Sequence, residues 1–339
     1  MSARERMSDM ANFSDIIGHE DIVKHFKSSV ELGKVSHAYI LNGEKGSGKR
    51  TIASAVAKML QCENGLPDPC GQCKSCLQAE SGNQPDIIWI RHEKSNVISV
   101  DEIRTQIVND VGLKPYSSRY KIYIVPDAQK MNIQAQNALL KTLEEPPEYA
   151  ILMLLTNHVD SFLPTILSRC IVMNLKPVDP LQVMEYLVNQ VGVDQEKARF
   201  CTDFAQGNLG KAARLAISPD YAEIKEDSIR LLRQMPDMEI EDVIREVKKI
   251  GKYKLDVSDY VDIMAMWFRD ILMLKISNSP NKMILKEEYS VIKKQASRVS
   301  YEGIENILAA MDKLKVRLEA NVNFDIAMEL MLLTVKENM

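Results

Sequence analysis

The sequence predicts an α/β domain with a mostly parallel sheet, followed by a region built only of helices. Three observations carry this prediction. Apolar runs with β-branched residues, at 38–41, 86–90, 121–125 and 150–156, are typical of buried strands. Segments of helical periodicity, at 52–60, 100–111 and 135–143, separate these runs, and such alternation favours a parallel sheet covered on both faces. From residue 178 onward the apolar positions repeat at helical spacing.

A chain of 339 residues exceeds the usual size of a single core, so several domains are expected. We predict an α/β domain over 1–177, a small helical domain over 178–218, and an all-helical domain over 219–339. The small domain should consist of three short helical pieces, broken at Gly192 and Gly207. The segment Ser218-Pro219-Asp220 is typical of a linker.

The composition is that of a soluble globular protein, with 45% hydrophobic and 27% charged residues. No apolar run approaches the length needed to span a bilayer, and the first residues lack the apolar core of a signal peptide. We therefore expect a cytoplasmic protein without a membrane partner. The formal net charge of −4 argues against nucleic-acid binding by bulk electrostatics, so any contact with DNA should be local or shared with partners.

The segment 37–51 has the pattern of a strand, a phosphate-binding loop and the start of a helix. Gly43, Gly48 and Lys49 fit the spacing G-x-x-x-x-G-K, and Gly46 adds a third glycine to the turn. Glycines allow backbone N–H groups to approach phosphate oxygens, and the lysine reaches the outer phosphates. A glycine-rich turn that binds no nucleotide remains the alternative.

The residues that would bind Mg²⁺ beside such a loop are missing. The loop lysine is normally followed by Ser or Thr, whose hydroxyl binds the metal, but here the next residue is Arg50. Thr51 lies about 100° farther around the helix. A nucleotidase would also carry an Asp, often followed by a Glu, after the strand at 121–125, where this chain has Pro126-Asp127. Adjacent residues at a strand end point to opposite faces, so Asp127 is no direct replacement.

Four of the six cysteines lie within residues 62–76: Cys62, Cys70, Cys73 and Cys76. Two C-x₂-C steps share Cys73, and the fourth thiol, Cys62, precedes them across a turn rich in glycine and proline. This pattern suits tetrahedral Zn²⁺ bound by four thiolates, which leaves no open position for water and so predicts a structural site. Unligated thiols and an iron–sulfur cluster are the alternatives.

Three features together resemble the bacterial replicative clamp loaders, the AAA+ subunits that open a ring-shaped sliding clamp and close it on primed DNA. They are the segment NALLKTLEEPP at 137–147, the triplet Ser168-Arg169-Cys170, and the position of the four-cysteine segment 62–76, here called the cysteine knuckle, between the phosphate loop and the next strand. The segment 318–323 and the run after it look like the collar of that family. The resemblance implies an AAA+ domain, a helical lid domain and a collar domain, over nearly the whole chain.

Within this family the motor subunits carry Ser or Thr after the loop lysine, Asp-Glu after the second strand, and an arginine after Gly-Ser-Leu. This chain has Arg50, Pro126-Asp127 and, in the place of that arginine, Gly210. The resemblance therefore implies a subunit that does not hydrolyse ATP by itself. It also implies that Arg169, preceded by Ser168, enters the ATP site of a neighbouring motor subunit as an arginine finger. A plain surface role for Arg169 is the alternative.

The partners that the resemblance implies are motor subunits and a clamp-opening subunit in a hetero-pentamer, which belongs to a DNA polymerase holoenzyme, a nucleotidyltransferase. The sliding clamp and primed DNA would be contacted through that assembly. Two other functions stay open. The chain is an active motor-type ATPase if Thr51 and Asp127 hold Mg²⁺. Alternatively, it binds ATP or ADP without hydrolysis, through the loop residues Gly43, Gly46, Gly48, Lys49 and Thr51.

Overall fold

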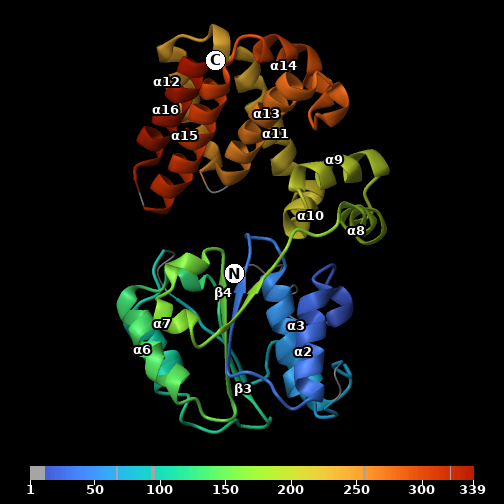
Figure 1. Ribbon diagram of the computed structural model, residues 1–339, viewed down its shortest axis with the longest axis vertical. Helices are drawn as coiled ribbons and strands as arrows, with labels where there is room; N and C mark the ends of the chain where they lie inside the picture. Colours follow the sequence, from blue (N-terminus) through green and yellow to red (C-terminus); the bar gives the residue numbers. More distant parts are fainter. Residues whose placement is uncertain (1–11, 66–67, 93–95, 255–256, 321) are drawn as a thin grey trace. The chain divides into compact units, whose positions relative to one another are not determined.

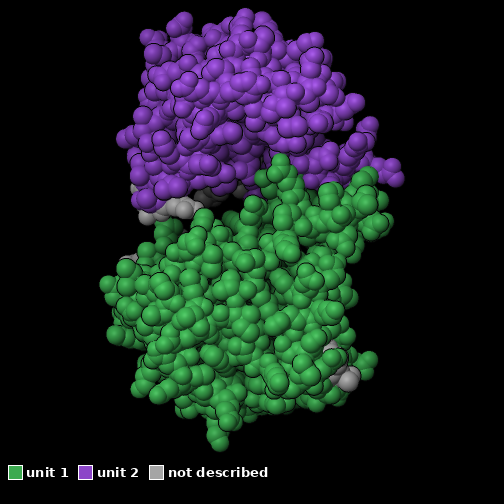
Figure 2. Space-filling model, in the orientation of Figure 1, with its two compact units in different colours: residues 1–192, 205–213 green, residues 193–204, 214–339 purple. Residues whose placement is uncertain are grey.

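The computed structural model describes residues 12–65, 68–92, 96–254, 257–320 and 322–339. The chain divides into two compact units, which Figure 2 colours separately. Unit 1 comprises residues 1–192 and 205–213, and unit 2 comprises residues 193–204 and 214–339. The finer division into three domains, with boundaries after residues 177 and 218, stays a prediction.

A five-stranded parallel sheet with the strand order β2-β3-β4-β1-β5 organises unit 1 (Figure 1). The strands are β1 Ala38–Asn42, β2 Ile87–Trp89, β3 Lys121–Val125, β4 Ala150–Thr156 and β5 Ile171–Asn174. The first four confirm the predicted strands. The sequence analysis missed β5, a short edge strand that pairs only with β1 and leaves Ile171 and Val172 39% and 37% exposed.

Successive residues of the strands point to opposite faces and supply two separate cores. Tyr39 and Leu41 of β1 pack into the core beneath α2 Glu20–Glu31 and α3 Lys49–Gln61. Ala38 and Ile40 pack into the core of the other face, which α6 Ile133–Glu144 and α7 Pro164–Leu167 cover (Figure 1). Because both faces are covered, β4 is buried at every position, which explains its unbroken apolar sequence.

The remaining helices of unit 1 are short. They are α4 Lys74–Glu80, α5 Val100–Ile103 and α8 Pro180–Tyr186, with π-helical turns η2 Arg104–Val108 and η5 Leu187–Val191 and short 3₁₀ turns η1 Phe13–Asp15, η3 Ala128–Lys130 and η4 Val159–Ser161. The predicted helix at 100–111 begins as expected, with a capping box between Ser99 and Glu102, but it continues as the π-helical turn. In the described ranges, every helix is too short or too polar to cross a membrane.

The described residues of unit 2 form helices and no strand, as predicted. The α-helices at and beyond the boundary between the units are α9 Gln195–Ala205, α10 Leu209–Ile217, α11 Pro219–Gln234, α12 Ile240–Ile250, α13 Val257–Ser277, α14 Tyr289–Ala296, α15 Tyr301–Glu319 and α16 Phe324–Asn338. Short 3₁₀ turns complete the unit: η6 Met235–Asp237, η7 Gly251–Tyr253, η8 Pro280–Lys282 and η9 Lys286–Glu288. Met264, Met328 and Met331 are buried, so these methionines are core residues.

One sequence prediction in this region is wrong. Ser218-Pro219-Asp220 is not a linker, because α11 begins at Pro219 with Ser218 at its N-cap position. Proline is well tolerated in the first turn of a helix, where its missing N–H would have no intrahelical partner. Asn321, in the segment that resembles the collar, lies outside the described residues.

Candidate functional site

The predicted phosphate loop lies at the carboxyl edge of the sheet, between β1 and α3. The N–H of Gly43 donates to the carbonyl oxygen of Thr156 at the end of β4, at 3.0 Å. Gly46 and Gly48 have φ angles of 90° and 97°, a left-handed conformation that favours glycine. Gly48 is the N-cap residue of α3, which begins at Lys49. The fold therefore brings the glycines and the lysine together as the sequence predicts.

Lys49 is bonded to the loop that carries it. Its Nζ atom donates to the carbonyl oxygen of Glu44 at 2.7 Å and to that of Gly43. Burial lowers the pKa of Lys49 to about 8, while the nearby carboxylates of Asp127 and Glu44 act in the opposite direction. The ammonium group thus uses backbone oxygens of its own loop as hydrogen-bond acceptors.

The N-terminal end of α10 packs directly on the phosphate loop. The N–H of Gly210 donates to the carbonyl oxygen of Gly46 at 3.0 Å, and Nδ2 of Asn208 donates to the carbonyl oxygen of Lys45 at 2.9 Å. A Cβ atom on Gly210 would lie 2.6 Å from that Gly46 oxygen and 2.9 Å from the Gly46 Cα. Because the obstructing atoms are backbone, position 210 accepts no side chain without a shift of the loop.

The positions that would bind Mg²⁺ in a motor subunit have other contacts. The Arg50 guanidinium lies 5.1 Å from the ring centroid of Trp89, within cation–π range. Thr51 is half-buried in the first turn of α3. Asp127 follows β3 in a left-handed conformation, and its carboxylate is 56% exposed and 3.4 Å from Nζ of Lys130. Among the residues that the structure describes, no hydrogen bond or ion pair directs Thr51 or Asp127 toward a shared metal ion.

Polar atoms at the same edge of the sheet form a feature that the sequence analysis missed. Ser47 Oγ, Gln129 Oε1 and Asn157 Oδ1 are buried and have no hydrogen-bond partner among the described residues. Buried polar groups are normally satisfied by protein or water, so this edge has unused capacity to bind a polar ligand or ordered water. Gln129 and Asn157 come soon after the ends of β3 and β4, and that position was the available signal.

An open hollow of about 800 Å³ lies beside the loop in unit 1. His19 connects the two, because its Nε2 lies 3.0 Å from the Ser47 carbonyl oxygen, and burial lowers the pKa of His19. The charged side chains that line the hollow are Lys176 and the four acids Glu20, Asp21, Asp179 and Glu185. This excess of negative charge disfavours phosphate groups in the hollow.

Ser168 and Arg169 follow α7 on the surface of unit 1. The Arg169 side chain is 34% exposed, and its Nη1 donates to the Thr165 carbonyl oxygen at 2.9 Å and to Ser168 Oγ at 3.1 Å. Its Nη2 forms an ion pair with Oε1 of Glu144, at 2.8 Å. The adjacent Cys170 packs against the core, and burial raises its pKa to about 12, so its thiol is poorly reactive.

Similarity to known proteins identifies the family. A family model described as "DNA polymerase III, delta subunit" matches residues 18–179. DNA polymerase III subunit delta' of Bacillus subtilis (strain 168) is 29% identical over 320 residues, which cover 93% of this chain and 95% of that protein. These matches support a clamp-loader subunit of DNA polymerase III. The AAA+-type fold that the resemblance implied is thereby confirmed.

A gamma subunit of DNA polymerase III matches this chain to a similar degree. DNA polymerase III subunit gamma of Buchnera aphidicola subsp. Schizaphis graminum is also 29% identical, over 95% of this chain and 94% of that protein. A solved structure of a gamma subunit-related protein from Thermotoga maritima shares 19% identity, covers 94% of this chain and 99% of that one, and has a TM-score of 0.46. Overall identity therefore does not separate the delta' type from the gamma type.

The four predicted metal ligands lie together at the end of α3, in the loop that follows it, and in the first turn of α4. The Sγ atoms of Cys62, Cys70, Cys73 and Cys76 are all within 4.8 Å of one another, and the cluster could hold a metal ion. Sulfurs of a tetrahedral zinc site with Zn–S bonds of about 2.3 Å lie about 3.8 Å apart, and Cys70 Sγ is 4.0 Å from Cys76 Sγ.

Backbone N–H groups of the knuckle point at its sulfurs. The N–H of Cys73 lies 3.3 Å from Cys70 Sγ, and that of Cys76 lies 3.4 Å from Cys73 Sγ. Hydrogen bonds from the Gln72 and Cys73 backbone lower the pKa of the Cys70 thiol to about 6. Such N–H groups stabilise thiolates and orient them toward a metal. The donor set and its surroundings therefore fit a thiolate-bound ion.

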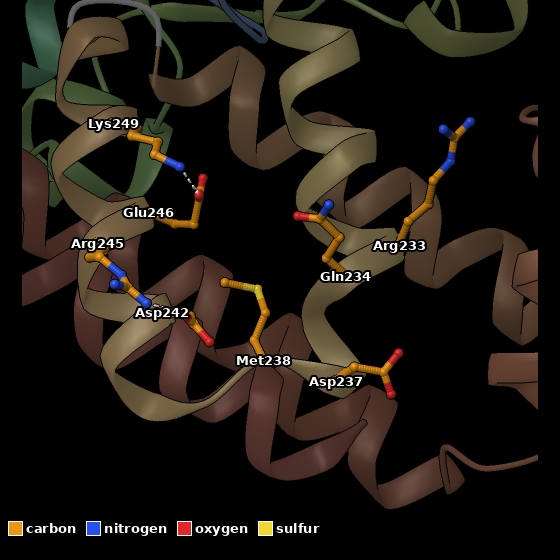
Figure 3. Close-up of a pocket in the computed structure, with 8 residues that line it drawn as sticks. All are labelled: Arg233, Gln234, Asp237, Met238, Asp242, Arg245, Glu246 and Lys249. Carbon is orange, nitrogen blue, oxygen red and sulfur yellow. Dashed lines mark hydrogen bonds and ion pairs between the residues drawn. The ribbon is translucent and has the colours of Figure 1, made fainter.

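Unit 2 contains a second hollow, of about 480 Å³, between the end of α11 and α12 (Figure 3). Its basic side chains already have acidic partners: Lys249 pairs with Glu246, and Arg245 pairs with Asp242. Arg233 Nε donates to Glu288 Oε2 at 2.8 Å. This compensation leaves little net charge to attract an ionic ligand, and we place the functional site in unit 1.

Proposed function

We propose that this chain is the delta' subunit of the clamp loader, the stator that hydrolyses no ATP itself and supplies Arg169 to the ATP site of a neighbouring motor subunit. The observation that carries the proposal is a contrast within unit 1. The phosphate loop is bonded to its own lysine and to α10, whereas Arg169 lies at the surface with part of its guanidinium exposed.

Three positions that are far apart in the sequence support the proposal that this chain hydrolyses no ATP itself. Arg50 contacts Trp89 where a metal-binding hydroxyl would be needed. Pro126 and an exposed Asp127 follow β3 where the metal-binding acid would stand. Gly210 contacts the Gly46 backbone where a motor subunit would carry an arginine. Each change removes a group that neutralises or orients the phosphates of ATP, and together they make hydrolysis in this site unfavourable.

Arg169 retains the properties that an arginine finger requires. A guanidinium that reaches the transferring phosphoryl group stabilises the charge of the transition state, and such fingers raise rates on the order of 10³–10⁵-fold in other systems. The group must be exposed in the free subunit, always charged, and fixed by its surroundings. Arg169 is one-third exposed, donates to two acceptors of its own segment, and forms an ion pair with Glu144.

The decisive experiment measures steady-state ATP hydrolysis by the isolated chain and by the loader reconstituted with motor, clamp-opening subunit, clamp and primed DNA. We expect no hydrolysis by the isolated chain and a large loss of stimulated hydrolysis with Arg169→Ala. The matched control is Arg199→Ala, which removes another exposed arginine. Hydrolysis by the isolated chain that Lys49→Ala abolishes would instead establish the motor-type alternative with Thr51 and Asp127 at the metal.

A second candidate function is the binding of ATP or ADP without hydrolysis. The buried polar atoms of Ser47, Gln129 and Asn157 at the edge of the sheet favour it, because they are unsatisfied hydrogen-bonding groups. The contact between Gly210 and Gly46 and the acidic hollow beside the loop oppose it. Equilibrium dialysis with labelled ATP and ADP tests it, and retention of neither nucleotide at millimolar concentration would reject it.

The remaining roles follow from the same proposal. The cysteine cluster holds structural Zn²⁺, which leaves no open coordination position for catalysis. The helical domain at 219–339 joins a collar with the other subunits of a hetero-pentamer, and the lid is the segment 178–218. The sliding clamp and primed DNA are contacted through that assembly.

A further inference from the structure

Glu144 is the residue through which the end of α6 contacts Arg169. It is the last residue of α6, separated by one residue from the two prolines at 146–147, and its side chain is 49% exposed. Arg169 follows α7, and α6 and α7 pack against each other. The 2.8 Å contact between Glu144 Oε1 and Arg169 Nη2 joins two sequence segments, the NALLKTLEEPP run and the Ser-Arg-Cys triplet, that are separated along the chain.

The three nitrogen atoms of the Arg169 guanidinium differ in their contacts within the chain. Nη1 donates to the Thr165 carbonyl oxygen and to Ser168 Oγ, and Nη2 is paired with Glu144. Nε has no hydrogen-bond acceptor among the described residues, so the Nε–H has no partner there. The Arg169 side chain is also 34% exposed, and a guanidinium can bind two oxygens of a phosphate at once.

We propose that Glu144 is a positioning residue for Arg169, which holds the guanidinium so that it is presented to the phosphates of the partner's nucleotide. This inference rests on the proposed function of Arg169. An arginine side chain has many rotamers, and an arginine that is already oriented loses less freedom when it enters the partner's site. Glu144 itself contacts no substrate and acts only through Arg169.

Thr165 and Ser168 alone would not fix this orientation. Both acceptors lie within four residues of Arg169 and both bind Nη1, so the guanidinium could still rotate about that nitrogen. Glu144 belongs to a different helix, and its ion pair with Nη2 holds the guanidinium at a second nitrogen atom. A partly exposed ion pair contributes little to folding stability, so its removal should change orientation more than stability.

An ion pair with Glu144 that restrained Arg169, instead of positioning it, would give the opposite result in the same experiment. If Glu144 kept Arg169 away from the partner's phosphates, then removal of its charge would raise the rate of hydrolysis. We instead expect a fall, because the Arg169 side chain stays 34% exposed with the ion pair in place and its Nε has no acceptor among the described residues.

The test compares Glu144→Gln with Glu145→Gln in the reconstituted loader. The two substitutions remove the same charge at adjacent exposed positions, and only Glu144 contacts Arg169 in the described structure. We expect Glu144→Gln to lower the clamp- and DNA-stimulated kcat about tenfold with an unchanged KM for ATP, and Glu145→Gln to leave both unchanged. The variant Arg169→Ala, Glu144→Gln should be no slower than Arg169→Ala alone, because Glu144 acts only through Arg169.

A second readout uses the free subunit with ¹⁵N-labelled arginine. In the wild-type chain the Nη groups of Arg169 should rotate slowly, and Glu144→Gln should accelerate this rotation, whereas Glu145→Gln should not. Wild-type kcat in the Glu144→Gln loader, when Arg169→Ala does lower kcat, would overturn this inference and leave the proposed function intact. Wild-type kcat in the Arg169→Ala loader would overturn both.

Discussion

Two regions of unit 1 carry a cation suited to ATP phosphates, and they differ in where that cation is directed. Lys49 begins α3 and bonds to backbone oxygens of Gly43 and Glu44, in its own loop. Arg169 follows α7, donates hydrogen bonds within its own segment, forms an ion pair with Glu144 of α6, and has a side chain that is 34% exposed. The loop motif is degenerate, and the triplet that contains Arg169 is intact.

The comparison between Lys49 and Arg169 teaches that a chain can contain a sequence motif without the chemistry that the motif usually supports. The loop keeps the glycine conformations of a phosphate-binding loop, yet α10 contacts it from a position about 160 residues later in the chain. Arg169 has no elaborate local motif, yet its side chain is 34% exposed and is held by an ion pair with Glu144. The proposed function therefore rests on the contacts of each cation and not on the motif alone.

The largest expected effect concerns the planar guanidinium of Arg169, the proposed arginine finger. Arg169→Lys keeps the charge but loses the planar fork, so we expect stimulated hydrolysis by the reconstituted loader to fall on the order of 10²-fold or more. Lys49→Met should change the same rate less than twofold, because Lys49 bonds to its own loop. Steady-state kinetics on both loaders measures the contrast, and equal losses would contradict it.

The cysteine cluster provides a test of whether the stability of unit 1 and the proposed role of Arg169 in ATP hydrolysis are independent. Cys73→Ser removes one of four candidate ligands, so we expect bound zinc to fall from one ion per chain toward none and unit 1 to lose about 2 kcal/mol or more of stability. Metal analysis and thermal unfolding measure these changes. A chelator should lower the melting temperature of the wild-type chain and not that of the variant. Hydrolysis per folded loader should remain near wild type.

A smaller effect is expected where α10 meets the loop. Gly210→Ala places a Cβ 2.6 Å from the Gly46 carbonyl oxygen, and overpacking of this kind costs about 1–3 kcal/mol. Faster hydrogen exchange of the amides in residues 43–48, measured by mass spectrometry, should report the loosened contact. Gly112→Ala is the control, because a Cβ at Gly112 meets nothing within 4 Å. Unchanged exchange in the Gly210 variant would mean that α10 does not restrain the loop.

The smallest effect is a pH dependence that arises from Lys49. Its pKa is about 8 in the folded chain, against about 10.4 for an exposed lysine. Between these values the unfolded chain binds the proton that the folded chain has released, so this group makes stability rise with pH from about 8 to about 10.4. The rise should be lost in Lys49→Met. An ¹⁵N titration of the Lys49 ammonium checks the pKa, and a midpoint above 10 would contradict the burial of this group.

The sequence by itself determined the features that depend on neighbours along the chain. Four strands, the glycine positions of the loop and the helical nature of the later segments follow from local spacing and composition. The four cysteines also lie close in sequence, so their spatial cluster could be predicted from spacing alone. Arg50, Pro126 and Gly210 were recognisable as departures because each stands at a fixed place in a motif.

Only the tertiary structure decided the contacts between distant segments. The bond of Gly210 to Gly46, the pairing of Glu144 with Arg169, and the edge strand β5 all depend on how the chain returns to the sheet. Periodicity reports which face of an element is buried, but it carries no information on which remote backbone covers that face. For this reason the sequence predicted the phosphate loop, and only the structure placed α10 against it.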